Sequence, residues 1–183
     1  MVSGFAAATP LSGLWQTEPN RALQTDGASL SAKLEIPVAQ SRAAHRYSFS
    51  ARSTGTGLVG LGLHAFVESS VKPEEFWAGT SVLVWLTRDP KHFGDNQARL
   101  QVYRSLSDTA MRLVKEVIVA ESPDELNRFT VDLDPITGSL SVALNDVQRL
   151  SCGGLSYLKQ GTSVVLRALD KAEFRDFRVE LLP

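Results

Sequence analysis

The chain has 183 residues, one cysteine, a formal net charge of −1, and 43% hydrophobic and 21% charged residues. This composition excludes a disordered chain, a disulfide-stapled domain and a cysteine-based metal cluster. The near-neutral charge offers no electrostatic surface for nucleic acid, and no stretch approaches the roughly 18 apolar residues of a membrane span. We therefore expect one domain with a substantial core, no nucleic-acid partner and no membrane insertion.

Alternation of apolar and polar residues in the first third of the chain predicts strands with one buried face. Residues 1–26 lack this pattern, so we expect an irregular N-terminal segment that packs on the domain. The strongest alternation covers Ala28–Val38, where Pro37 indicates an edge strand or a strand end. A second strand covers Tyr47–Ala51 and leads into a Ser-Thr-Gly-Thr-Gly turn at 53–57.

The middle of the chain continues as strands. Leu61–Val67 alternates, whereas Ser81–Arg88 is apolar on both faces, which predicts a central strand covered on both sides. Asp89–Gln97 has the proline, glycine and aspartate content of a loop. Two more strands are predicted over Arg99–Leu106 and Arg112–Glu121, where β-branched residues favour strand over helix.

The clearest element is a hairpin over Asn127–Asn145, in which two alternating segments flank Asp-Pro-Ile-Thr-Gly. We expect Asp134 to begin this turn by accepting hydrogen bonds from its own backbone, and Asn145-Asp146 to suit a tight turn with positive φ. The rest of the chain reads as a loop at Cys152–Gly154 followed by strands at Thr162–Leu169 and Phe174–Leu182. The pattern predicts an all-β fold: an antiparallel β-sandwich over residues 1–183, a jelly roll of about ten or more strands.

Three motifs together carry a family resemblance. Trp15 lies shortly before a leucine-rich alternating strand, Phe129–Asn145 forms the hairpin, and Phe174–Val179 has the closing pattern Phe-x-Asp-Phe-x-Val. This layout resembles the concanavalin A-like lectin/glucanase superfamily, which includes laminin-G-like jelly rolls. The resemblance implies a jelly roll over nearly the whole chain. It also implies an extracytoplasmic setting (periplasmic, secreted or cell surface), often with a carbohydrate partner.

Catalytic carboxylates are not evident. Retaining glycosidases of that superfamily carry a Glu-x-Asp-x-Glu triplet on one strand, and no such triplet occurs in this chain. The nearest pair, Asp132 and Asp134, is interpreted as structural. An atypical glycoside hydrolase that combines Glu116 with Asp132 from distant strands is the enzyme alternative.

We expect no cofactor and no metal–histidine site, because His45, His64 and His92 fall on separate segments without a metal-binding motif. The loop at Asp89–Asn96 offers an alternative. Its Asp89, Asp95 and Asn96 side chains supply the oxygen ligands that calcium prefers, although their spacing fits no EF-hand.

A sugar site needs exposed aromatic rings beside hydrogen-bonding side chains. The predicted ligand-binding residues are Trp77, Trp85, Tyr103, Arg104 and His64, with Arg99 and Gln101 nearby in sequence. Trp85 has a second interpretation as a core residue. The first hypothesis is a non-catalytic carbohydrate-binding domain, and the second is a structural or interaction module that binds another protein chain in a surface or secreted assembly.

Overall fold

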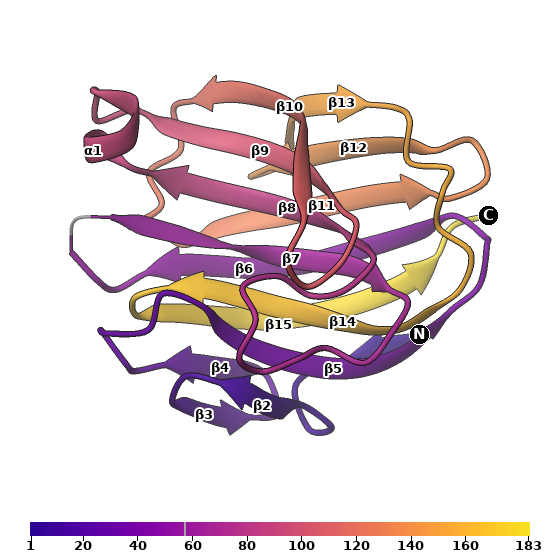
Figure 1. Cartoon of the computed structure of the whole chain (residues 1–183), viewed down its shortest axis with the longest axis horizontal. Helices are drawn as coiled ribbons and strands as arrows, with labels where there is room; N and C mark the ends of the chain where they lie inside the picture. The colour runs from indigo at the N-terminus through magenta and orange to yellow at the C-terminus, as the bar shows by residue number, and fades with distance from the viewer. Residues whose placement is uncertain (57) are drawn as a thin grey trace.

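A computed structural model describes residues 1–56 and 58–183, and in these residues it has fifteen strands and one short helix (Figure 1). All strand pairings among them are antiparallel, which confirms the predicted all-β class. The elements are β1 (Val2–Ser3), β2 (Thr9–Ser12), β3 (Trp15–Glu18), β4 (Arg21–Gln24), β5 (Ala32–Gln40), β6 (His45–Ser53), β7 (Val59–Val67), β8 (Ser81–Arg88), α1 (Pro90–Phe93), β9 (Ala98–Ser105), β10 (Met111–Val119), β11 (Asn127–Asp134), β12 (Ser139–Leu144), β13 (Val147–Cys152), β14 (Gly161–Leu169) and β15 (Ala172–Leu181).

Two sheets form the sandwich. The back sheet has the order β13-β12-β11-β6-β15-β4-β3, with β1 added beside β15, and the front sheet has the order β10-β9-β8-β7-β14-β5-β2 (Figure 1). The last strand of the chain therefore lies between β6 and β4, which brings the two ends of the sequence together. This is the predicted jelly roll.

The core fills the space between the two sheets. Every second residue of a strand points inward, so the alternation found in the sequence becomes one apolar layer per sheet. At its centre the rings of Phe49 on β6 and Phe129 on β11 stack, with centroids 4.6 Å apart and an interplanar angle of 7°. Trp15 covers one margin of this layer, packing against Phe174 at 6.0 Å.

Several turns form as their residues predict. Asp134 Oδ1 accepts hydrogen bonds from the backbone N–H groups of Ile136 and Thr137 at 2.8 and 3.3 Å, so this carboxylate starts the β11–β12 turn. Asn145 and Asp146 have φ values of 50° and 66° in the two-residue β12–β13 turn. Both positions are left-handed, as predicted for this dipeptide.

Other elements differ from expectation. The segment 1–26 contains four short strands, β1 to β4, each too short to show a periodic pattern. Cys152, the first residue of the predicted loop at Cys152–Gly154, is instead the last residue of β13, an edge strand with mostly exposed residues. Asp89–Gln97 includes α1, a single helical turn. Gly57, the last residue of the predicted 53–57 turn, lies outside the described residues. Among the described residues, no helix is long and apolar enough to cross a membrane.

The connection between β7 and β8, residues 68–80, does not leave the sheet but folds across the outer face of the front sheet (Figure 1). It builds a second, small apolar cluster there, in which Val71 and Ala78 of the connection pack against Val67 and Val165 of the sheet. This connection covers part of the front sheet and leaves the rest of its outer face accessible.

Candidate functional site

The site begins with a row of side chains on the outer face of the front sheet. Strand register aligns one residue from each of six neighbouring strands: Lys33, Arg167, Gly62, Trp85, Gln101 and Glu116. The glycines of β7 are needed because the Trp85 ring lies across this strand. A Cβ atom at Gly60 would come within 2.1 Å of that ring.

A groove of about 470 Å³ lies over the part of this row formed by Trp85, Gln101 and Glu116. Trp85 is only 6% exposed and forms the floor, whereas Phe76 is 45% exposed and forms part of the wall together with the half-buried Tyr103. Exposed apolar side chains surround the opening: Leu30, Leu58 and Leu113. The groove is therefore mainly apolar, with aromatic rings at its floor and wall.

A chain of polar contacts crosses one side of the groove. Tyr103 Oη donates to Gln101 Oε1 at 3.0 Å, and Gln101 Nε2 donates to Glu116 Oε2 at 2.5 Å. Arg99 Nε lies 3.5 Å from the other oxygen of Glu116. Burial and the nearby Glu116 carboxylate raise the pKa of Tyr103, so its phenol remains a hydrogen-bond donor at neutral pH.

Arg99 is itself fixed by the loop that carries α1. Both Asp95 carboxylate oxygens accept hydrogen bonds from it at 2.8 Å, and its guanidinium lies 4.0 Å from the centroid of the Phe93 ring. The hydrogen bond from Arg99 lowers the pKa of Asp95 to about 2, and the bond to Asp95 raises that of Arg99. The polar side of the groove is thus held in place by Asp95, which lies outside the groove, and by Phe93, which lines it.

The 68–80 connection closes one end of the groove. Lys33 Nζ donates to the carbonyl oxygens of Lys72 at 2.7 Å and Glu75 at 2.5 Å, which ties the connection down to β5. On its other side, Trp77 N donates to the carbonyl oxygen of Asp108 in the β9–β10 turn at 3.0 Å. Burial and the neighbouring Arg167 lower the pKa of Lys33.

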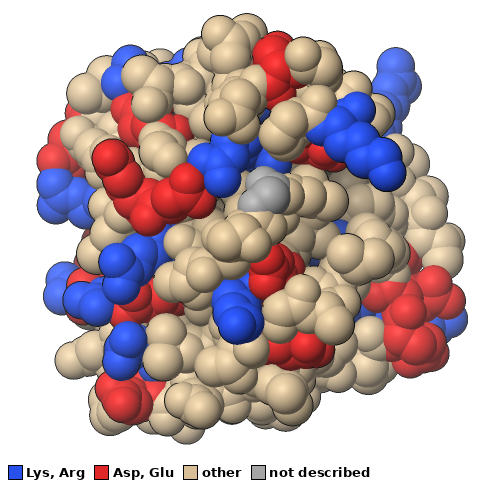
Figure 2. Space-filling model, turned by 90° about the vertical axis from the view of Figure 1, so that its left-hand side faces the viewer, with Lys and Arg blue, Asp and Glu red and all other residues tan. Residues whose placement is uncertain are grey.

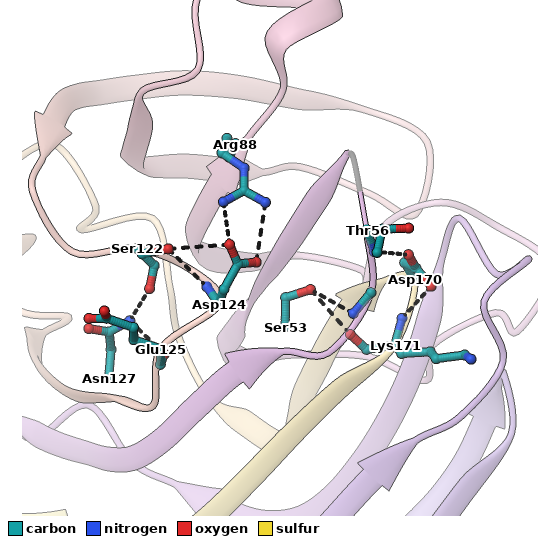
Figure 3. A network of polar contacts seen from close by, with 10 residues as sticks. Ser53, Thr56, Arg88, Ser122, Asp124, Glu125, Asn127, Asp170 and Lys171 are labelled. Carbon is teal, nitrogen blue, oxygen red and sulfur yellow. Dashed lines mark hydrogen bonds and ion pairs between the residues drawn. The ribbon is translucent and has the colours of Figure 1, made fainter.

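The loops near the opposite end of the front sheet, where Asp89, His92 and Phe93 line the groove, are joined by a polar network (Figure 3). Arg88, at the end of β8, donates to both carboxylate oxygens of Asp124 at 2.5 and 3.2 Å. Asp170, in the β14–β15 turn, accepts from Thr56 N at 3.2 Å. These contacts fix three connections at the same end of the sandwich. Basic and acidic side chains intermingle over this end, in keeping with the near-neutral net charge (Figure 2).

The structure brings three of the five predicted ligand-binding residues together. Trp85 and Tyr103 line the groove, and Trp77 lines a smaller cavity that adjoins it. His64 lies on the same face but is fully buried, and Nδ1 is 2.9 Å from Ser81 Oγ. Burial lowers the pKa of His64 well below its usual value, with Arg167 and Lys33 acting in the same direction.

Arg104 lies elsewhere. It alternates with Tyr103 along β9 and so points to the opposite side of the sheet, where its guanidinium stacks 4.2 Å from the centroid of the Tyr157 ring. Sequence reasoning missed Phe76 and Arg167, which line the groove or its adjoining cavity. Two features of the sequence could have indicated them. Phe76 is a second aromatic residue beside Trp77, and Arg167 is the single charged residue within the apolar β14.

The carboxylates considered for hydrolysis are not brought together. Asp132 lies on the back sheet, where it accepts two hydrogen bonds from Arg46 at 2.7 Å, whereas Glu116 lies on the front sheet. The pairing of Glu116 with Asp132 is therefore wrong, because two sheets and the core separate their outer faces. Retaining hydrolysis needs carboxyl groups about 5 Å apart.

The predicted calcium loop has its carboxylates engaged within the protein. Asp95 binds Arg99, and Asp89 Oδ1 accepts from His92 N at 2.9 Å as the N-cap of α1. Within residues 1–56 and 58–183, no group of three His, Cys, Asp or Glu side chains is arranged to hold a metal ion. Calcium at this loop stays a prediction, and a calorimetric titration with calcium chloride tests it.

Comparison with known proteins identifies the fold that carries this groove. No family model and no curated protein matches the sequence. Solved structures do match. The carbohydrate-binding module CBM66 from Bacillus subtilis covers 95% of this chain and 95% of its own, with a TM-score of 0.70 and 12% identity. A legume lectin-like domain from Entamoeba histolytica covers 97% and 91%, with a TM-score of 0.69 and 7% identity.

The chain has the concanavalin A-like jelly-roll fold. A presumed glycosyl hydrolase from Parabacteroides distasonis shares it, covering 98% of this chain and 91% of its own at a TM-score of 0.62 and 14% identity. At these identities the likeness concerns the fold, which confirms the resemblance seen in the sequence. The function of this concanavalin A-like chain has to be argued from its own groove.

Proposed function

We propose that this protein is a non-catalytic carbohydrate-binding domain that acts outside the cytoplasm. The observation that carries the proposal is the groove of the front sheet, which combines aromatic walls with a fixed chain of hydrogen-bonding side chains. A pyranose ring has the matching chemistry, because its C–H face is apolar and its rim is polar. Carbohydrate-binding and lectin-like domains among the structures of the same fold add support.

The ligand would lie over the floor formed by Trp85, with its C–H face against Phe76 or Tyr103. Its hydroxyl groups would exchange hydrogen bonds with Gln101 and Glu116, whose polar atoms already line the groove. Because Arg99 holds Glu116 in place, little side-chain freedom would be lost on binding.

The test is a glycan array followed by calorimetry on the glycans that bind. We expect Phe76→Ala and Tyr103→Ala to weaken binding at least tenfold, since each removes part of the aromatic wall, while the thermal midpoint changes by only a few degrees. Ile136→Ala is the matched control, because Ile136 is an exposed apolar side chain in the β11–β12 turn of the back sheet. Glycan binding that survives both groove substitutions would contradict the proposed site.

A second candidate function is an interaction module that binds another protein chain. It is favoured by the four exposed apolar side chains that converge on one groove, Leu30, Leu58, Phe76 and Leu113. Failure of every glycan to bind at millimolar concentration, together with a stable complex with a partner protein in size-exclusion chromatography, would favour this candidate.

The absence of catalysis and the extracytoplasmic setting are parts of the proposal with their own tests. Hydrolysis of a polysaccharide panel that is lost in Glu116→Gln would show an enzyme instead. Cell fractionation with an antibody to the protein tests the setting, and recovery in the cytoplasmic fraction would contradict it.

A further inference from the structure

Arg167, on β14, is a buried cation without a polar partner among the described residues. It is 1% exposed, and its Nε atom is enclosed with no hydrogen-bond acceptor. Aromatic faces surround its guanidinium instead, with centroids at 4.2 Å for Trp77, 4.9 Å for Trp85 and 5.0 Å for Phe76. Burying a guanidinium without an anion is costly, and cation–π contacts offset only part of that cost.

The surroundings add positive charge. Lys33 lies beside Arg167 in register on β5, and its ammonium group is occupied by backbone carbonyl oxygens of the 68–80 connection. No ion pair joins either side chain to a carboxylate in the part of the chain that the structure describes. Burial lowers the pKa of Arg167 to about 9, which still leaves it charged at neutral pH. Asp108, Glu74 and Glu75 act to raise the pKa of Lys33, so the charge without a nearby anion is that of Arg167.

Space for an anion exists next to Arg167. A cavity of about 100 Å³ is lined by Arg167, Trp77 and Met111, and it shares Phe76, Trp85 and Tyr103 with the groove. This volume equals about three water molecules at roughly 30 Å³ each. It therefore has room for the three heavy atoms of a carboxylate.

We propose that the groove binds an acidic saccharide, and that the carboxylate of its terminal uronic acid residue enters the small cavity and pairs with Arg167. This inference rests on the proposed carbohydrate function and specifies its ligand class. A carboxylate is planar and pairs with a guanidinium edge to edge, through charge-assisted hydrogen bonds that are strong in a site shielded from water. The sugar ring of the same residue would remain in the groove, against Phe76 and Tyr103.

The first experiment needs no mutation. Calorimetry compares uronic acid oligosaccharides with the same oligosaccharides after their carboxyl groups are reduced to alcohols. We expect binding of the reduced form to be at least about tenfold weaker, which corresponds to about 1.4 kcal/mol for the loss of one hydrogen-bonded charge pair. An oligosaccharide whose only charged group is a sulfate ester forms a third arm.

The second experiment uses Arg167→Met, which keeps a long side chain and removes the unpaired charge. It should fold at least as well as the native protein, because a buried charge is replaced by an apolar group, and it should lose the preference for the carboxylate form. Arg112→Met is the matched control, because Arg112 is an exposed arginine on β10 that does not line the cavity. If Arg167→Met fails to fold, the comparison of ligands on the native protein decides alone.

The outcomes separate this inference from the proposed function. Equal binding of the uronic acid and reduced forms would overturn the carboxylate site while leaving carbohydrate binding intact. Preference for the sulfate ester would overturn the carboxylate as the anion. Equal loss of binding in both arginine variants would show a general charge effect and also refute the site. If no glycan of any kind binds, the proposed function fails, and this inference fails with it.

Discussion

A buried carboxylate on the back sheet gives a prediction whose size can be worked out. Glu173, on β15, has a side chain that is 1% exposed and forms ion pairs of 2.6 to 2.7 Å with Arg21, Arg52 and Arg175. Burial by itself raises the pKa of Glu173, but hydrogen bonds from the three arginines outweigh burial and lower the pKa from 4.5 to about 2. The perturbation is Glu173→Gln, which keeps the shape and removes the charge.

The expected loss of stability follows from the pKa. One pH unit of difference between folded and unfolded pKa is worth about 1.4 kcal/mol, so the change from 4.5 to about 2 sets an upper bound of about 3 kcal/mol on the electrostatic contribution. The three arginine side chains are 38% to 41% exposed, so solvent screens part of this interaction. We expect Glu173→Gln to lower the free energy of unfolding by about 2 kcal/mol at pH 7.

The lowered pKa of Glu173 determines how its contribution to stability depends on pH. Because the folded pKa lies below the unfolded pKa, the stabilisation is complete above about pH 5 and is lost as the pH falls from 4.5 toward 2. Urea unfolding followed by tryptophan fluorescence should show a deficit of about 2 kcal/mol at pH 7 and of less than about 1 kcal/mol at pH 3.

Asp132→Asn is the control, because it removes a carboxylate with one half-exposed arginine partner and should cost less than about 1 kcal/mol. A Glu173→Gln variant as stable as the native protein at pH 7 would refute the reasoning. So would a deficit of the same size at pH 3, because it would show that the charge is not responsible.

Three further predictions concern the core, a turn and the groove floor. Phe129→Ala removes one ring of the stacked pair with Phe49 and should cost about 3–5 kcal/mol in chemical denaturation, and a loss below about 1 kcal/mol would contradict the core assignment. Asp146 has a φ of 66°, so Asp146→Gly should be about 1 kcal/mol more stable than Asp146→Ala, and equal unfolding midpoints would speak against it. Gly60→Ala would place a Cβ 2.1 Å from the Trp85 ring, so it should cost about 1–3 kcal/mol and shift the tryptophan emission; an unchanged spectrum would show that the ring does not lie there.

The fold was predictable where elements are long and alternate strictly. The Asn127–Asn145 hairpin and the two-sided apolar strand at Ser81–Arg88 occur where the sequence placed them, because each has enough residues to show its buried face. The strands before residue 27 have two to four residues each, too few for a period to appear. Strand β13 was missed because it is an edge strand whose residues are mostly exposed.

The site was less predictable because it depends on contacts between distant segments. Trp85 and Tyr103 were found from residue type, whereas Arg104 was misplaced because alternation along β9 turns it to the other side of the sheet. His64 is on the predicted face but is fully buried beside Ser81, directly after the 68–80 connection, whose path no local pattern indicates. Arg167 meets Trp77 and Trp85 across more than 80 residues, a juxtaposition that only the assembled sheet creates.

The closed end of the groove has a consequence for stoichiometry. The 68–80 connection is bound to β5 on one side and to the β9–β10 turn on the other. Under the proposed function, a polysaccharide that lies along the strands would therefore have to enter the groove by a terminus. Interior residues of a long polymer in that direction would run into the connection. The binding capacity of a glycan sample would then scale with its number of chain ends instead of its mass. When the same polymer is cut into shorter pieces, each unit of mass carries more chain ends, so a lower mass concentration would saturate the domain. Binding by the protein would therefore respond to depolymerisation.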